Sequence, residues 1–189
     1  MNTALLVIDA QQSFAQRTSW VDSEATAYMH AQQTLIDGMH RLGLPVIQIF
    51  HHDDDEEFQL DSGFVRTLDG LQVNPDAIFY KTRHSALVGT GLDVWLRQHG
   101  INHLIISGIR TEQCCETTTR HASDLGFKVD YVTEATHTFA MQHAASGECF
   151  EAAAIKRRSE LVLAGRFAHI HTVSSVLAAL AVLQQEGLA

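Results

Sequence analysis

The sequence has few of the residues that mark unusual protein classes. Its 189 residues include only 2 prolines and 12 glycines, which excludes a collagen-like or Pro-rich low-complexity chain. It has 3 cysteines, an odd number, so a framework of disulfides is not expected, and a reducing cytoplasmic compartment is favoured. Lys and Arg number 13 against 22 Asp and Glu, for a net charge of −9. No basic stripe is present, and we therefore expect no nucleic-acid partner.

The sequence also lacks a long apolar run. No segment of about 18 apolar residues occurs, which argues against a transmembrane helix and a membrane partner. The first residues have no basic cluster and reach a carboxylate at Asp9, unlike a secretory signal peptide. The chain is nevertheless 46% hydrophobic and 19% charged, a balance typical of a folded protein. Its length corresponds to roughly one domain, and we expect a single domain over residues 1–189.

Short apolar runs alternate with amphipathic stretches along the chain. The runs are unbroken rather than alternating, which indicates strands buried on both faces, as in parallel sheets. They lie at residues 4–8, 45–50, 77–80, 103–107, 128–132 and, more weakly, 168–173. Helices are expected between them, at about 22–42, 90–100, 114–125, 148–163 and 174–185. This alternation predicts an α/β fold, with an open sheet and right-handed crossovers.

Three chemically active side chains stand beyond the ends of predicted strands. Asp9 ends the first run, Lys81 ends the third, and Cys114 follows the fourth at an expected helix start. Because ligands bind at the carboxyl ends of parallel strands, we expect these side chains to meet there. A nearby cation and a helix N-terminus favour a thiolate, and a carboxylate can carry the thiol proton. Backbone N–H groups at the start of this helix are candidates for holding an oxyanion.

Each of these residues has an ordinary explanation when it is taken alone. An Asp after a strand is often a turn residue, and a Lys at a strand end is usually solvated. A Cys near a helix start is often a small buried residue. Their coincidence at three equivalent positions favours the catalytic interpretation over these alternatives.

Four stretches of the sequence carry a resemblance to a known family. They are residues 6–11 with Phe14, residues 80–87 with Gly89, Thr90 and Leu92, residues 108–115 with Thr118 and Ala122, and residues 124–129 with Glu134 and Ala135. They resemble the isochorismatase-like cysteine hydrolases, the superfamily that includes nicotinamidase, N-carbamoylsarcosine amidohydrolase and isochorismatase. The resemblance runs from about residue 3 to residue 185.

The resemblance implies a catalytic triad and a fold. Cys114 would be the nucleophile, Asp9 the proton carrier, and Lys81 the group that stabilises the thiolate. The implied fold is a three-layer αβα sandwich with a mostly parallel six-stranded sheet, which is Rossmann-like. Members of the family are often dimers or tetramers, so a homo-oligomer is expected.

The resemblance also implies an oxyanion hole. A cis peptide bond would fall between Ile109 and Arg110, and the backbone amides of Arg110 and Cys114 would be the donors. Two positions depart from the family pattern. Cys115 stands where an apolar residue is usual, and we interpret it as a packing residue beside the nucleophile. Arg110 replaces a small residue, and its side chain could either reach the pocket and attract an anion or lie on the surface.

Histidines and aromatic residues near the predicted strand ends complete the site. The run from His51 to Glu57 could bind a divalent ion. Related nicotinamidases have an Asp-x-His beside the pocket, but Ile49 stands at the Asp position here, so no metal and no cofactor is expected. The substrate pocket is predicted to include Phe14, Trp20, His51, Phe64, His84 and Arg110.

These features predict a metal-independent cysteine hydrolase of small molecules. It would cleave an amide or ureido C–N bond through a thioester on Cys114. One alternative is an isochorismatase-type vinyl-ether hydrolase with Asp9 as general acid, which needs no thiol, so the intact Cys114 argues against it. The other alternative is a non-catalytic binding or redox module that uses the vicinal pair Cys114–Cys115.

Overall fold

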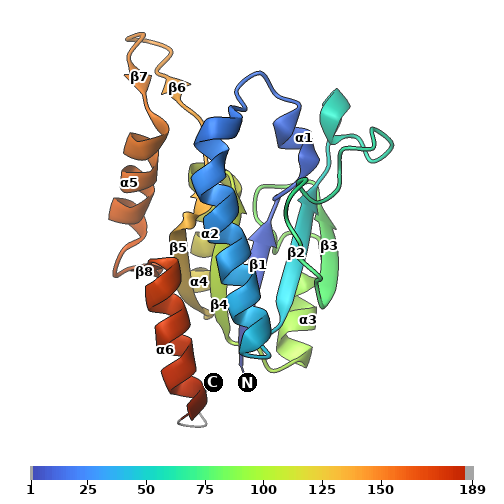
Figure 1. Cartoon of the computed structure of the whole chain (residues 1–189), viewed down its shortest axis with the longest axis vertical. Coiled ribbons are helices and arrows are strands. Elements are labelled where there is room, and N and C mark those ends of the chain that lie inside the picture. The colour runs from blue at the N-terminus through green and yellow to red at the C-terminus, as the bar shows by residue number, and fades with distance from the viewer. Residues whose placement is uncertain (1, 186–189) are drawn as a thin grey trace.

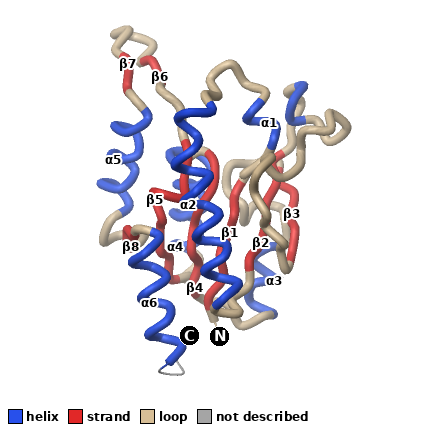
Figure 2. Tube along the Cα trace, in the orientation of Figure 1, coloured by secondary structure: helices blue, strands red, loops and turns tan. Residues whose placement is uncertain are grey.

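A central sheet of six parallel strands organises the chain. The computed structural model describes residues 2–185 (Figures 1 and 2). The strand order is β3-β2-β1-β4-β5-β8, and every neighbouring pair is parallel. The strands are β1 (Thr3–Ile8), β2 (Val46–His51), β3 (Ala77–Lys81), β4 (His103–Ile109), β5 (Lys128–His137) and β8 (His169–His171). The α/β fold predicted from the sequence is thus confirmed, and the sheet is wholly rather than mostly parallel.

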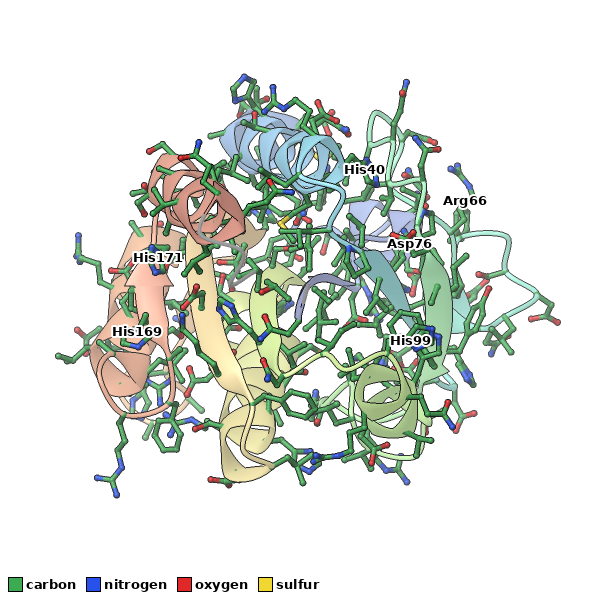
Figure 3. All side chains as sticks on the ribbon, turned by 90° about the horizontal axis from the view of Figure 1, so that it is seen from below. His40, Arg66, Asp76, His99, His169 and His171 are labelled. Atoms are coloured by element: carbon green, nitrogen blue, oxygen red, sulfur yellow. The ribbon has the colours of Figure 1, made fainter. Side chains whose placement is uncertain are left out.

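Helices cover both faces of this sheet. Helices α2 (Asp22–Arg41) and α6 (Val173–Gln185) pack on one face. Helices α3 (Leu92–Gln98), α4 (Glu116–Asp124) and α5 (Ala152–Leu163) pack on the other. Figure 3 views the molecule from below, with His169 and His171 on β8 at one edge of the sheet. The three layers have the αβα arrangement that the resemblance implied.

Strand β1 lies between β2 and β4 in the sheet. Its position explains why residues 4–8 are all apolar. Leu5 and Val7 belong to the core under α2 and α6, whereas Leu6 and Ile8 belong to the core under the other helices. All four are 0% exposed. Since each fully buried side chain of this size contributes about 1.5–3 kcal/mol, both faces of the strand require apolar residues.

The structure differs from the predicted elements after residue 132. Strand β5 continues to His137 instead of stopping near Val132. A small antiparallel hairpin, which was not predicted, then forms from β6 (Met141–Gln142) and β7 (Cys149–Phe150), so the helix expected from about residue 148 begins only at Ala152. In Figure 1 this hairpin extends beyond the carboxyl ends of the strands. Its strands are two residues long and exposed, so they leave no periodic pattern in the sequence.

Helix ends also differ in detail from the prediction. The helix expected over residues 22–42 begins at Asp22, after Val21 and without a side-chain cap, and ends at Arg41. The carboxylate of Asp22 instead accepts a hydrogen bond from Trp20 Nε1 at 2.8 Å. The helix expected over residues 90–100 is shorter, and the Thr90 hydroxyl before it accepts a hydrogen bond from the Leu92 amide at 3.2 Å.

Two close approaches position the elements. Gly108 in β4 has φ +122°, and a Cβ atom there would overlap the carbonyl oxygen of Ile8 in β1. Gly38 in α2 lies so close to Leu177 of α6 that a Cβ would be 2.5 Å from its methyl carbons. The first approach brings the carboxyl ends of β1 and β4 together. The predicted site residues Asp9 and Cys114 follow these two strands. None of the helices within residues 2–185 is long and apolar enough to cross a membrane.

Candidate active site

Asp9, Lys81 and Cys114 meet at the carboxyl ends of the strands. Asp9 follows β1, Lys81 is the last residue of β3, and Cys114 lies in the π-helical turn η2 (Thr111–Cys115) after β4. The Lys81 Nζ atom is 2.7 Å from Asp9 Oδ2 and 3.4 Å from Cys114 Sγ. Their exposed fractions are 0% for Asp9, 1% for Lys81 and 6% for Cys114. The ammonium group thus links a carboxylate and a thiol that are 105 residues apart in sequence (114 − 9).

The backbone of Asp9 holds its carboxylate in an uncommon conformation. Its φ is +50°, in the left-handed region that residues other than glycine rarely adopt. The Asp9 amide donates to the Ile49 carbonyl at 2.9 Å, and its own carbonyl accepts from Gln11 at 2.8 Å. Such a conformation costs of order 1–3 kcal/mol and persists where the surroundings enforce it. These two hydrogen bonds therefore fix the direction of the carboxylate.

The thiol lies in a wider helical turn than the sequence suggested. An α-helix was expected from Cys114, but residues 111–115 form η2, and α4 begins at Glu116. The Cys115 amide donates to the Arg110 carbonyl at 3.1 Å, which is the wider i+5 spacing of a π-turn. The peptide bond between Ile109 and Arg110 is cis. Cys114 and Arg110 are consequently held at opposite ends of one short turn.

Burial controls the protonation of the site. Burial raises the pKa of the Cys114 thiol, the Asp9 carboxylate raises it further, and Lys81 only partly opposes them. Burial alone would lower the pKa of Lys81, but Asp9 and Cys114 bring it above its ordinary value. A nearby cation and a helix N-terminus were expected to favour a thiolate, whereas burial favours a thiol beside the Asp9–Lys81 ion pair. Asp9 Oδ1, with no hydrogen-bond partner in residues 2–185, is available to receive the thiol proton.

His51 connects this group to a second carboxylate. Its Nδ1 is 3.1 Å from Lys81 Nζ, and its Nε2 is 3.0 Å from Asp53 Oδ2. Gln11 fixes the strand end, since its side chain accepts from the His51 amide and donates to the His51 carbonyl. Burial and the charge of Lys81 lower the pKa of His51. A neutral ring can accept a hydrogen bond from Lys81 through Nδ1 and donate one to Asp53 through Nε2.

A cavity of about 480 Å³ opens beside Asp9 and Cys114. Four of the predicted pocket residues line it, namely Phe14, His51, His84 and Arg110. His84 Nδ1 is 3.8 Å from Cys114 Sγ. A volume of this size is at the lower end of the range for small-molecule sites. The remaining lining residues are Arg17, Thr18, Ser19, Asp53, Asp55, Phe58 and Gln113.

Two predicted pocket residues do not line this cavity. Trp20 borders a neighbouring cavity, because its indole is tied to Asp22 and packs against His137 and Phe139. Phe64 contributes its main chain instead of its ring to the region. Its carbonyl accepts from both the amide and the hydroxyl of Ser13. Both residues were placed by nearness in sequence to the strand ends, which does not determine the direction of a side chain.

The sequence analysis missed the wall formed by helices α1 (Gln12–Ala15) and η1 (Glu56–Phe58). Arg17 Nη2 lies 2.6 Å from Asp55 and 3.7 Å from Glu57, and its guanidinium stacks over Phe58. The only sequence signal was Phe58, an apolar residue within an acidic segment. Opposite charges in two distant loops gave no periodic pattern that could pair them.

The acidic and histidine-rich segment is not arranged as a metal site. Within residues 2–185, no three His, Cys, Asp or Glu side chains are grouped so that they could hold a metal ion. His51 and Asp53 hydrogen-bond to each other instead. Cys115 is 0% exposed in the hydrophobic core and does not line the cavity. The position of Cys114 at the cavity wall distinguishes it from its neighbour.

Comparisons with known proteins identify the family and the fold that this chain resembles. Residues 3–156 match the family model of the isochorismatase domain. Nicotinamidase 3 of Arabidopsis thaliana is 32% identical over 152 residues, which cover 72% of this chain and 73% of that protein. A ureidoacrylate amidohydrolase of Pantoea ananatis is 28% identical over 173 residues, which cover 71% and 69%. A solved structure of an isochorismatase-family hydrolase from Chromobacterium violaceum has a TM-score of 0.86 at 26% identity, covering 96% of this chain and 94% of that one.

Proposed function

Because the chain belongs to the isochorismatase family of hydrolases, we propose that it hydrolyses a carbon–nitrogen bond of a small molecule with Cys114 as the nucleophile. The scissile bond is that of an amide or ureido group. The reaction uses Asp9 and Lys81 as partners of the thiol and passes through a thioester. The proposal involves no metal ion and no organic cofactor.

One observation carries this proposal, the contact of a single ammonium group with both a carboxylate and a thiol. Lys81 Nζ lies 2.7 Å from Asp9 and 3.4 Å from Cys114, and Asp9 and Cys114 both line the cavity. A charged pair that is almost wholly buried costs desolvation free energy. Its retention beside a nucleophile supports a catalytic role more than a structural one.

The first half of the reaction forms the thioester. The Cys114 thiol passes its proton to Asp9 as the sulfur attacks the carbonyl carbon of the substrate. Lys81 stabilises the thiolate that develops in this step. The carbonyl oxygen becomes an oxyanion, for which the backbone amides of Arg110 and Cys114 are the proposed donors. The C–N bond then breaks, and the nitrogen leaves as ammonia or an amine with the proton from Asp9.

The second half of the reaction releases the acid. A water molecule attacks the thioester carbonyl while Asp9 accepts a proton from it. The C–S bond breaks, the product departs as a carboxylic acid from an amide or as a carbamic acid from a ureido compound, and the proton returns to the sulfur. Each cycle therefore consumes one water and leaves Cys114, Asp9 and Lys81 in their starting protonation states.

The relatives support a C–N bond as the target. Both are named for amidase activity, one on nicotinamide and one on ureidoacrylate. The cavity of about 480 Å³ suits compounds of comparable size. The burial of Cys114 also suits this chemistry, because a protonated thiol beside a carboxylate can transfer its proton as attack begins.

The test is release of ammonia from a panel of small primary amides and ureido compounds. Wild-type protein is compared with Cys114→Ala and with Cys115→Ala as the matched neighbour. We expect Cys114→Ala to lose at least about a thousandfold in kcat/KM. Cys115→Ala should keep turnover within about tenfold, because its side chain lies in the core away from the cavity.

Three results would contradict the proposal. Amide turnover that persists in Cys114→Ala would exclude the thiol as nucleophile. Pyruvate release from isochorismate that is unaffected by Cys114→Ala, together with no amide turnover, would instead establish the vinyl-ether reaction through Asp9. Reversible oxidation of the vicinal thiols with no hydrolysis of any compound would favour the binding or redox module.

A further inference from the structure

The charged groups around the cavity are paired, with one exception. Lys81 pairs with Asp9, and Arg17 pairs with Asp55. Asp53 accepts hydrogen bonds at both oxygens, from the His51 ring and from the Asp55 amide. Arg110 also lines the cavity, yet within residues 2–185 its guanidinium forms no ion pair and no hydrogen bond. The chain has 22 acidic residues against 13 basic ones, so this cation is unpaired despite an excess of carboxylates.

An aromatic ring holds the Arg110 side chain in place. Its guanidinium carbon lies 4.8 Å from the centre of the Phe139 ring. Phe139 is 3% exposed and is itself packed against Phe14 at 6.3 Å and His137 at 5.0 Å. A guanidinium that stacks on a ring keeps its N–H groups free along its edge. The side chain is therefore oriented while its hydrogen-bond donors stay unused.

Arg110 and the proposed nucleophile Cys114 belong to the same turn. Arg110 follows β4 and Cys114 lies at the far end of the same π-turn, whose Cys115 amide is bonded to the Arg110 carbonyl. The acidic segment that contains Asp53 and Asp55 follows β2, on the other side of β1 in the sheet. The cavity thus has a positive side near β4, next to the thiol, and a compensated acidic side near β2.

We propose that the substrate carries a carboxylate group and that Arg110 binds this group in a bidentate, hydrogen-bonded ion pair. The inference rests on the proposed function, because it names the class of compound that the Cys114 site hydrolyses. The substrate is thus an amide or ureido derivative of a small carboxylic acid. Arginine suits this role because its planar N–H groups match the two oxygens of a carboxylate.

The proposal predicts a preference between matched compounds. The pairs are succinamate with butyramide and 3-ureidopropionate with propylurea, in which the first member carries a carboxylate and the second carries none. Charge-assisted hydrogen bonds contribute about 1.5–3 kcal/mol, so we expect kcat/KM to favour the anionic member by about 10- to 100-fold. Arg110→Gln should abolish this preference, by lowering kcat/KM for the anionic member about 10- to 100-fold more than kcat/KM for the neutral member. Arg110→Lys should retain part of it, because the charge remains and the planar fork is lost.

Arg97→Gln provides a matched control. Arg97 in α3 also stacks on a phenylalanine, Phe127, at 5.2 Å, but it does not line the cavity. This change removes a charge and a ring contact of the same kind, together with a hydrogen bond to the Leu125 carbonyl. It therefore separates anchoring of the substrate from a general effect on charge or stability. We expect Arg97→Gln to keep the wild-type preference for the anionic compounds.

Binding measured without turnover separates this proposal from the proposed reaction. In a Cys114→Ala background, calorimetric titration should show at least about tenfold tighter binding of the anionic members, and adding Arg110→Gln should remove the difference. If wild-type protein hydrolyses no amide but this difference is observed, the anion site stands and the proposed function fails. Equal binding of charged and neutral members across both pairs, or a preference that survives Arg110→Gln, would overturn the Arg110 proposal, even if amide hydrolysis is found.

Discussion

The protonation of His51 determines whether one or two positive charges lie beside Asp9 at the candidate site. His51 was predicted as a pocket residue by its place after the apolar run at residues 45–50, and the structure adds its contacts with Lys81 and Asp53. We regard it as a positioning residue, because it touches Lys81 instead of the reacting carbonyl. A neutral ring accepts from Lys81, whereas a protonated ring would present a second cation 3.1 Å from the ammonium group.

A pH profile tests this role of His51. Because burial and Lys81 lower its pKa from the ordinary 6.5, the ring is neutral at pH 7, and kcat/KM should fall only as the pH drops below about 6.5. In His51→Gln, whose amide oxygen can still accept from Lys81, this acid limb should move to lower pH. His52→Gln is the neighbouring control and should keep the wild-type profile. An acid limb unchanged in His51→Gln would show that another group titrates there.

Individual residues show where prediction from sequence succeeded. Asp9, Lys81 and Cys114 could be placed together because each ends or follows a parallel strand, and strand ends share an edge. Burial of Cys114 could not be predicted, since it depends on packing from segments far away in sequence. Burial raises the pKa of the Cys114 thiol, which favours a protonated thiol over the expected thiolate. Arg17, Asp55 and Phe58 were missed because their contacts join two irregular loops.

At the scale of elements, the junction of β1 and β4 positions the site. Gly108 belongs to the motif that the sequence analysis singled out, and its role there is steric. Its φ of +122° and the overlap of any Cβ with the Ile8 carbonyl both exclude a side chain. The carbonyl belongs to a central strand, so the backbone cannot move aside without separating β1 from β4.

Substitution at Gly108 should therefore disrupt the molecule. We expect Gly108→Ala to lower the free energy of unfolding by more than about 3 kcal/mol, or to prevent folding, because steric overlap adds to the strain of a positive φ. Gly126→Ala is the control, since φ is +87° there but no atom lies within 4 Å of the added Cβ. It should cost only about 1 kcal/mol. Urea unfolding of both variants checks this, and equal losses would contradict the steric explanation.

Prediction of the elements themselves had a clear limit. Apolar runs located all six strands of the central sheet, and the stretches between them located its covering helices. The continuation of β5 through Glu134 was not apparent, because polar residues interrupt the apolar pattern there. The π-turn η2 was likewise expected to be α-helical, since a single wider turn changes the periodicity too little to be detected.

For the molecule as a whole, His137 links pH to stability. It is 4% exposed beside Tyr28 and Phe139. Burial, followed by the charges of Lys156 and Arg110, lowers its pKa to about 4. The folded protein therefore keeps this ring neutral, whereas the unfolded chain takes up a proton near pH 6.5. Between about pH 6.5 and 4 this difference favours the unfolded state as the pH falls.

Replacing His137 with a residue that does not titrate should make the free energy of unfolding depend less on pH. We expect wild-type stability to fall by up to about 1.4 kcal/mol per pH unit from this group between about pH 6.5 and 4. His137→Phe keeps an aromatic ring and removes the ionisable nitrogen atoms. It should lose less stability than wild-type protein between pH 7 and about 5, as measured by urea unfolding. An identical loss in the two proteins would rule out His137 as the source.

The pairing of β1 with β4 also bears on the time course of biosynthesis. Thr3 lies beside His103 in the sheet, although 100 residues separate them (103 − 3). At roughly 5–20 residues per second, a ribosome needs about 5–20 s to make the intervening chain. During that interval β1, the most apolar strand, cannot pair with β4. Nascent chains should therefore depend on chaperones until β4 emerges. The site around Cys114 can assemble only after that.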